Sequence, residues 1–367
     1  MNPSSVARRR LLVALVVSTG LVLSAPFVGV VRGEIRKAFP EQFSLIINGM
    51  VGAALLAAVL VGLSRIREHR MTRYAAMAMA FVTGATFAGL TGSPDPAVRA
   101  VEHFHFVQFG IITLLFYRTW RDRADCAALA MPIMAAFIVG IAEEAFQWFI
   151  PARVGELRDV WLNGVAIGCG LLFAAGIEPP VPFTVGWRPG SRRLASRLLA
   201  AAVLTLAAFI HTVHLGQEIH DPEIGVFDTR FSAERLAALS AERTEQWKTD
   251  PPETRPPRLS REDQYMTEGL QHVQARNTAW DAGDAKAAWR ENLILERYFQ
   301  PVLDTPSYVS PTGHRWGPDH RADASERAKD TVGQPFTSAA YPYPLFYWSP
   351  RLLWVVALLA AGALLLL

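Results

Sequence analysis

The sequence has 367 residues, of which 51% are hydrophobic, with a mean hydropathy of +0.19 and a formal net charge of +3. The apolar residues occur in long blocks, which excludes an ordinary water-soluble globular domain. The basic residues are dispersed along the chain. We therefore expect no nucleic-acid partner, because such binding needs a concentrated basic surface.

The apolar blocks are long enough to predict membrane-spanning helices. A helix needs about 20 apolar residues to cross a hydrocarbon core about 30 Å thick. The sequence predicts spans at 11–31, 45–63, 74–91, 101–117, 126–150, 160–177, 198–215 and 352–367. The predicted fold class is all-α, a polytopic transmembrane bundle of about eight spans with a mostly helical extracytoplasmic domain between the seventh and the eighth.

The positions of Lys and Arg predict the orientation, because cytoplasmic loops retain positive charge. With the N-terminus inside, 14 basic residues flank the spans on the cytoplasmic side and 7 lie on short outer segments. The sequence therefore predicts a multi-pass protein of the bacterial inner membrane with both termini in the cytoplasm. Residues 216–344 would then lie outside the cytoplasm.

Residues 216–344 differ in composition from the rest of the chain. They hold 15 Lys and Arg residues against 21 Asp and Glu residues, so this segment is acidic. We expect it to form a separate domain that packs on the membrane part or docks a partner. The chain then divides into 1–44 with the first span and an outer loop, 45–177 as a transmembrane core, 178–215 with a cytoplasmic loop and the seventh span, 216–344, and 345–367 with the last span.

Helix-start signals predict three helices in the acidic domain. Ser232 is a typical N-cap residue, and Ser260 with Asp263 three positions later forms a capping-box pattern. A turn at 281–284 separates the second helix from the third. The predicted helices cover about 232–246, 260–280 and 285–299, and residues 305–340 are expected to be an irregular loop.

The fourth, fifth and sixth spans carry polar residues. An ionised side chain at a helix centre costs roughly 2.5–3.5 kcal/mol to insert, and less near the interface. Such groups should therefore face other helices instead of lipid. In the predicted topology all of them lie at the outer ends of their spans: Glu102, His103 and His105 in the fourth, Glu143, Glu144 and Gln147 in the fifth, and Asp159 and Asn163 at the start of the sixth.

Two interpretations of this polar layer stay open. In one, the acidic groups pair with His105 and with Arg153 and Arg158 of the short outer loop, and form a clasp that holds the three spans together. In the other, they line a pocket that opens outward, where His105, Glu144 and Arg153 meet a ligand. Both predict that the charged atoms of these last three residues lie within roughly 8 Å of one another.

No cofactor and no metal site are predicted. His214 and Glu218 are four residues apart, with His211 nearby, and this spacing matches a metal-binding face. A zinc site needs three or four ligands with supporting hydrogen bonds, however. We interpret these residues as polar groups at the membrane interface.

The polar layer also contains two motifs. The first is Glu102-His103-Phe104-His105-Phe106-Val107-Gln108-Phe109-Gly110, and the second runs through Glu143-Glu144, Gln147, Pro151, Arg153, Arg158-Asp159-Val160 and Asn163. Together they resemble the two signatures of the VanZ-like family of bacterial membrane proteins. The resemblance covers about residues 45–177. It departs from the family at Phe109, where many members carry Tyr, and at Ala152, where Gly is usual.

The resemblance implies a role in the cell envelope, since founding members of the family confer low-level resistance to the glycopeptide teicoplanin. It says nothing about residues 198–367. The functional positions that it implies are Glu102, His105, Glu144, Gln147, Arg153, Asp159 and Asn163.

Three functions follow from these observations as hypotheses. The leading one is recognition of a polar or anionic envelope molecule, a lipid-linked precursor or a glycolipid, with Arg153 on the anionic group. The second is an intramembrane enzyme acting on a lipid-linked phosphate, with His105 as general base, oriented by Glu102 or Glu144. The third is a scaffold subunit whose acidic domain binds a protein partner. Membrane lipids are partners in all three.

The predicted orientation can be tested by cysteine labelling. The native thiols Cys126 and Cys169 are replaced by Ser, and Asp250→Cys is introduced into the acidic domain. We expect a membrane-impermeant maleimide to label intact spheroplasts at this position. Labelling that requires an opened inner membrane would contradict the topology.

Overall fold

The computed structural model describes residues 3–151, 153, 155–182, 184–254, 259, 263–331 and 333–367. The chain forms two compact units. The first, here called the bundle, comprises Met1–Trp148, Val154–Val213 and Leu353–Leu367. The second, here called the polar unit, comprises Phe149–Arg153 and His214–Leu352. Each is described below by itself.

Among the described residues, seven helices are long and apolar enough to cross a membrane. The chain is therefore a polytopic membrane protein, as the sequence predicts. These helices are α1 (Pro3–Ala38), α2 (Phe43–Arg65), α3 (Arg70–Thr91), α4 (Pro96–Trp120), α5 (Ala127–Gln147), α6 (Leu157–Ile177) and α7 (Pro189–Phe209), the last continued by a π-helical turn at Ile210–His214.

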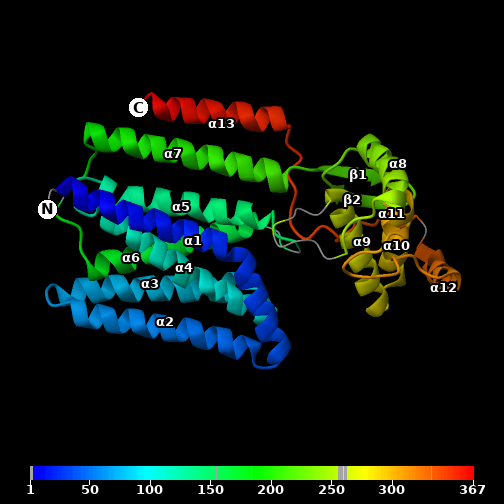
Figure 1. Cartoon of the computed structure of the whole chain (residues 1–367), viewed down its shortest axis with the longest axis horizontal. Helices are drawn as coiled ribbons and strands as arrows, with labels where there is room; N and C mark the ends of the chain where they lie inside the picture. Colours follow the sequence, from blue (N-terminus) through cyan, green and yellow to red (C-terminus); the bar gives the residue numbers. More distant parts are fainter. Residues whose placement is uncertain are drawn as a thin grey trace. The chain divides into compact units, whose positions relative to one another are not determined.

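The eighth predicted span is present as a shorter helix. α13 (Pro350–Leu365) has 16 residues, which gives a length of about 24 Å at 1.5 Å per residue. This is less than the roughly 30 Å of a hydrocarbon core. In Figure 1 the helices α1 to α7 run in alternating directions, and the C-terminal end of α13 lies at the same end of the bundle as the start of α1.

Helix α4 lies at the centre of the bundle and contacts α1, α2, α5 and α6. Its side chains Phe109, Ile112 and Phe116 are almost completely buried. In a membrane, close helix packing depends on small residues, because lipid supplies no hydrophobic force between helices. A Cβ atom at Gly170 of α6 would lie only 2.9 Å from Cα of Gly110 in α4. Glycine at both positions therefore allows α4 and α6 to approach.

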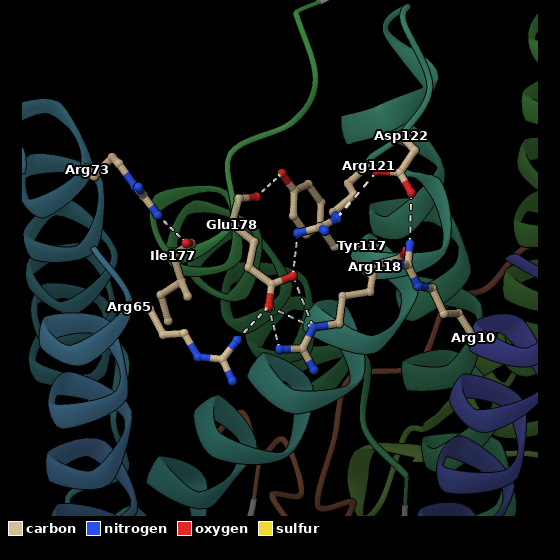
Figure 2. Close-up of polar contacts among 9 residues, drawn as sticks. All are labelled: Arg10, Arg65, Arg73, Tyr117, Arg118, Arg121, Asp122, Ile177 and Glu178. Atoms are coloured by element: carbon tan, nitrogen blue, oxygen red, sulfur yellow. Dashed lines mark hydrogen bonds and ion pairs between the residues drawn. The ribbon is translucent and has the colours of Figure 1, made fainter. Parts of the chain in front are cut away.

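A network of ion pairs joins the helix ends at the opposite end of the bundle from the polar layer (Figure 2). The carboxylate of Glu178, directly after α6, lies 2.6 Å from Arg118 Nη2 and 2.6 Å from Arg121 Nη1. Arg65 of α2 lies 3.9 Å from the same carboxylate. Glu178 therefore ties the end of α6 to α2 and α4.

Arginine side chains also cap the C-terminal end of α6. The guanidinium group of Arg73 in α3 donates a hydrogen bond to the carbonyl oxygen of Ile177 (Figure 2) and another to that of Gly176. The last carbonyls of a helix have no partner within the helix, and a cation is favourable there. Tyr117 of α4 donates a further hydrogen bond of 2.6 Å to the carbonyl of Glu178. These contacts fix the axial position of α6.

The polar unit consists of a β-hairpin and several helices around its own hydrophobic core. The hairpin pairs β1 (Gln217–Asp221) with β2 (Gly225–Thr229) in antiparallel register, with Ile219 opposite Phe227. The sequence interpretation missed this hairpin. The helices are α8 (Ala233–Thr249), α9 (Gln264–Asp281), α10 (Ala285–Tyr298), α11 (Gln300–Asp304) and α12 (Pro318–Ala328), which is followed by a 3-10 turn at Lys329–Thr331.

The helix caps decide where these helices begin. Ser232 accepts a hydrogen bond from the backbone N–H of Arg235 and caps α8 as predicted. The second predicted start is wrong, because Asp263 caps α9 through the N–H groups of Tyr265 and Met266, while Ser260 lies outside the described residues. The expectation of an irregular loop over 305–340 is also wrong, since α12 forms within it.

Loss of the Glu178 charge should destabilise the bundle. Glu178→Gln removes a half-buried charged acceptor from two arginines, and hydrogen bonds to charged groups contribute about 1.5–3 kcal/mol. We expect a loss of that size in denaturant or thermal unfolding in detergent. Asp122→Asn is the control, because Asp122 pairs with Arg10 at the surface and should change stability by less than about 1 kcal/mol. Equal effects would contradict the assignment.

The same carboxyl group should make stability depend on pH. Burial raises the pKa of Glu178, but the hydrogen bond and charge of Arg118 and the charges of Arg121 and Arg65 lower it below its ordinary value of 4.5. A lowered pKa in the fold gives stability that is present above the ordinary pKa and is lost as pH falls through the lowered value. Wild type should therefore lose stability below about pH 4.5, and Glu178→Gln should lose less.

Candidate functional site

Helix α4 places His105 inside the bundle. Asp95 caps α4 by accepting a hydrogen bond of 2.7 Å from the N–H of Ala97, and Pro96 occupies the first turn. His105 is 9% exposed, and its Nδ1 lies 2.7 Å from Oδ1 of Asn163 in α6. Because an amide oxygen can only accept, Nδ1 carries the proton, and in the neutral imidazole Nε2 is then the nitrogen with the lone pair. His105 is therefore oriented by Asn163, and the expectation that Glu102 or Glu144 orients it is wrong.

Two adjacent carboxylates at the end of α5 lie beside this histidine. Glu143 is 7% exposed and Glu144 is fully buried. The amide nitrogen of Gln147, one helical turn later, donates to Glu143 Oε1 at 2.8 Å and to Glu144 Oε1 at 3.3 Å. Among the described residues, Glu143 Oε2 has no hydrogen-bond partner. The end of α5 therefore holds a pair of buried carboxylates with an unused oxygen.

Gly155, just before α6, packs directly against the backbone of Glu144. A Cβ atom at Gly155 would lie 1.9 Å from the carbonyl oxygen of Glu144, so only glycine permits this approach. This contact brings the N–H of Glu156 within 3.3 Å of Glu144 Oε2. Burial and the neighbouring charge of Asp159 raise the pKa of Glu156, which the charge of Arg158 partly opposes. Asp159 and Glu156 thus lie close enough for the charge of one to change the pKa of the other.

A separate ion pair lies at the edge of the polar layer. Glu102 Oε1 is 2.7 Å from Arg158 Nη2, and the other oxygen of Glu102 accepts a hydrogen bond of 3.0 Å from the N–H of Ser93. The same Nη2 donates to the carbonyl oxygen of Thr91 at 2.9 Å. The side chain of Arg158 is 48% exposed, whereas that of Glu102 is 10% exposed. This pair therefore joins α3, α4 and α6 and presents its cationic side outward.

A cleft of about 290 Å³ opens beside this ion pair. Apolar side chains make up most of its wall, and the exposed indole of Trp161 stands at its edge. The lining residues are Phe87, Ala88, Thr91 and Gly92 from the end of α3 and just beyond it, Glu102 and Phe106 from α4, and Arg158, Trp161 and Leu162 from α6. The cleft combines an apolar wall with one guanidinium group.

His105, Glu143 and Glu144 together have the composition of a metal-binding group. All three are buried, and the ligand atoms that they offer lie within 4.8 Å of one another. Asp159 lies within electrostatic range of His105, Arg158, Glu102 and Glu143. It therefore connects the histidine–carboxylate group with the ion pair at the cleft.

Six of the seven predicted site residues come together in the bundle: Glu102, His105, Glu144, Gln147, Asp159 and Asn163. Arg153 is half-buried and belongs to the polar unit, so its distance from His105 and Glu144 stays a prediction. Of the acidic groups that are expected to pair with an arginine after α5, Glu102 does so in the structure, and its partner is Arg158.

The structure adds three residues to the seven functional positions that the motif resemblance implies. Glu143 supplies the unpartnered carboxylate oxygen, Arg158 the guanidinium group at the cleft, and Trp161 the exposed aromatic edge. The signal for Glu143 is its position next to Glu144, and the signal for Arg158 is its position in the first turn of α6. Trp161 carries no signal in the sequence that separates it from a lipid-facing residue.

The arrangement can now be compared with known proteins. No family model, curated protein or solved structure matches this chain. The resemblance to the VanZ-like family therefore depends on the motif residues alone.

The His105–Asn163 hydrogen bond should contribute to the stability of the bundle. Asn163→Ala leaves the buried Nδ1–H of His105 without an acceptor, which costs about 1–3 kcal/mol. Unfolding in detergent measures this loss. A matched control exists, because Nδ1 of the half-buried His103 lies 2.9 Å from Oδ1 of the exposed Asn48 in α2. Asn48→Ala should cost less, since this hydrogen bond lies at the surface of the bundle, and equal losses would contradict the importance of burial.

Proposed function

We propose that this polytopic membrane protein is a VanZ-like envelope protein that binds a lipid with an anionic head group in the cleft between α3, α4 and α6. The observation that carries the proposal is the cleft of about 290 Å³ whose apolar wall meets Arg158. The apolar wall suits the hydrocarbon chain of a lipid, and the guanidinium group of Arg158 suits its phosphate or carboxylate. A lipid-linked precursor or a glycolipid of the envelope combines both.

The chemistry of Arg158 favours this ligand class. Its guanidinium group uses Nη2 for Glu102 and for the carbonyl of Thr91. Almost half of its side chain is exposed, so donors are available to an incoming anion, and a guanidinium group can bind a phosphate through two parallel hydrogen bonds. Glu102 holds the guanidinium group of Arg158 in place, and this lowers the entropy cost of binding a ligand.

The motif resemblance supports the location of this function. The motif residues that belong to the bundle lie around the cleft and the buried carboxylates: Glu102, His105, Glu144, Gln147, Asp159 and Asn163. The family resemblance implies an envelope role. We further propose a bacterial inner-membrane location, with both termini in the cytoplasm and the polar unit outside it. In that orientation the cleft lies in the outer leaflet, where envelope lipids are handled. From the sequence alone, Arg153 stays a predicted contact for an anionic group.

Lipid retention tests the proposal. The full-length protein is extracted in a mild detergent, and the bound lipids are identified by native mass spectrometry. Arg158→Lys keeps the charge but removes the planar fork, and we expect roughly a tenfold loss of the retained anionic lipid. Trp161→Ala should also weaken retention, because it removes apolar contact area from the cleft.

The control is Arg36→Gln, which removes an exposed arginine near the end of α1, away from the cleft. It should leave the lipid profile unchanged. Thermal unfolding of each variant separates loss of binding from loss of fold. If Arg158→Lys and Trp161→Ala both retain the same lipids as wild type, the cleft is not the binding site.

A further inference from the structure

We propose that His105, Glu143 and Glu144 form a binding site for a divalent transition-metal ion at the end of α5. This inference is independent of the lipid proposed for the cleft. It concerns a different set of side chains, and it is tested by a different measurement. The ligands would be one imidazole and two carboxylates from the facing helices α4 and α5.

The geometry of the three side chains fits an ion. Their ligand atoms lie within 4.8 Å of one another, and all three residues are buried. Zinc with bonds of about 2.0–2.1 Å holds tetrahedral ligands about 3.3 Å apart. Small rotations of the two glutamate side chains cover the difference, because each has three rotatable torsions. The backbone therefore needs no rearrangement to close around an ion.

The charge of the group calls for a cation. Burying a carboxylate without a partner is costly, and two adjacent carboxylates also repel each other. Within the described part of the bundle neither Glu143 nor Glu144 forms an ion pair, since Arg158 is bound by Glu102. Glu143 Oε2 has no hydrogen-bond partner among the described residues although the side chain is more than nine-tenths buried. A divalent ion would neutralise both carboxylates and use this oxygen.

The neighbouring side chains have the arrangement that supports metal ligands. A metal-binding histidine usually donates its other ring N–H to a carbonyl or carboxylate oxygen, which fixes the ring. Nδ1 of His105 donates in this way to Asn163 Oδ1 at 2.7 Å, so Nε2 is the available ligand atom. Gln147 donates to both carboxylates and fixes their orientation. Each proposed ligand therefore has its own orienting hydrogen bond.

The ligand types narrow the class of ion. Imidazole favours zinc, manganese, iron or similar transition metals over magnesium and calcium, which prefer oxygen ligands throughout. Three protein ligands also leave coordination positions for water or for an anionic group of a bound molecule. A site of this kind binds an exchangeable small ligand at the metal instead of serving only to hold the fold.

Metal analysis of the purified full-length protein tests the site. The protein is prepared with a tag that lacks histidine, stripped with a chelator, and then reloaded with Zn²⁺ or Co²⁺ alone. We expect about one ion per chain by mass spectrometry of the metals. Bound Co²⁺ should give visible d–d absorption bands. Zn²⁺ should raise the thermal unfolding temperature of the stripped wild type, because an ion that binds only the folded state stabilises it.

Glu143→Gln is the main variant, because it keeps the shape of the side chain and removes one ligand charge. It should lower metal affinity at least tenfold and abolish the Zn²⁺-dependent rise in unfolding temperature. The matched control is His103→Gln, which removes the other histidine of the same motif and should leave metal content unchanged.

Several outcomes would overturn the proposal. A stripped wild type that binds neither Zn²⁺ nor Co²⁺ stoichiometrically would show that the carboxyl groups share a proton instead. Equal metal binding by wild type and Glu143→Gln would place the ion elsewhere. If Glu143→Gln does not fold, the stripped and reloaded wild type still decides the question. Lipid retention measured on the same samples separates failure of this site from failure of the cleft.

Discussion

The carboxylate of Glu178 is the interaction on which the arrangement of the bundle depends. It binds Arg118 and Arg121 at the end of α4 and lies near Arg65 of α2, while Arg73 of α3 caps the carbonyls just before it. These contacts fix one end of α6 against three other helices (Figure 2). Because a helix is rigid along its length, the residues at the other end of α6 are then held at a defined depth in the bundle.

The contact between Gly110 and Gly170 fixes the rotation of α6 about its own axis, which the contacts of Glu178 do not fix. Where two backbones approach this closely, only one face of each helix can meet the other. That face of α6 also carries Asn163, which therefore meets His105 of α4 at hydrogen-bond distance. The polar layer thus depends on packing some two turns away. The Glu102–Arg158 pair is one contact of the predicted clasp. The cleft beside it has a different lining from the pocket that the sequence predicts around His105, Glu144 and Arg153.

In the polar unit, the structure differs from the sequence interpretation where local signals compete. Ser232 starts α8 because its hydroxyl accepts a hydrogen bond from the backbone N–H of Arg235. At the next helix two caps are available, and Asp263 reaches the free N–H groups. The hairpin of β1 and β2 has two strands of five residues, too short for a clear alternating pattern. Its turn is made by Asp221, whose side chain accepts hydrogen bonds from the N–H groups of Glu223 and Ile224.

The sequence by itself determined the membrane-spanning helices, because insertion into lipid depends on the length and polarity of each segment alone. It also placed the ionisable residues of α4, α5 and α6 in one layer. Only the tertiary structure decided the partners within that layer: Asn163 orients His105, Arg158 pairs with Glu102, and Oε2 of Glu143 has no hydrogen-bond partner among the described residues. Partner choice depends on the rotation and depth of each helix. The contacts of Glu178 and of the Gly110–Gly170 pair set this rotation and depth. Because these contacts lie far from the polar layer, local spacing in the sequence does not reveal the partners.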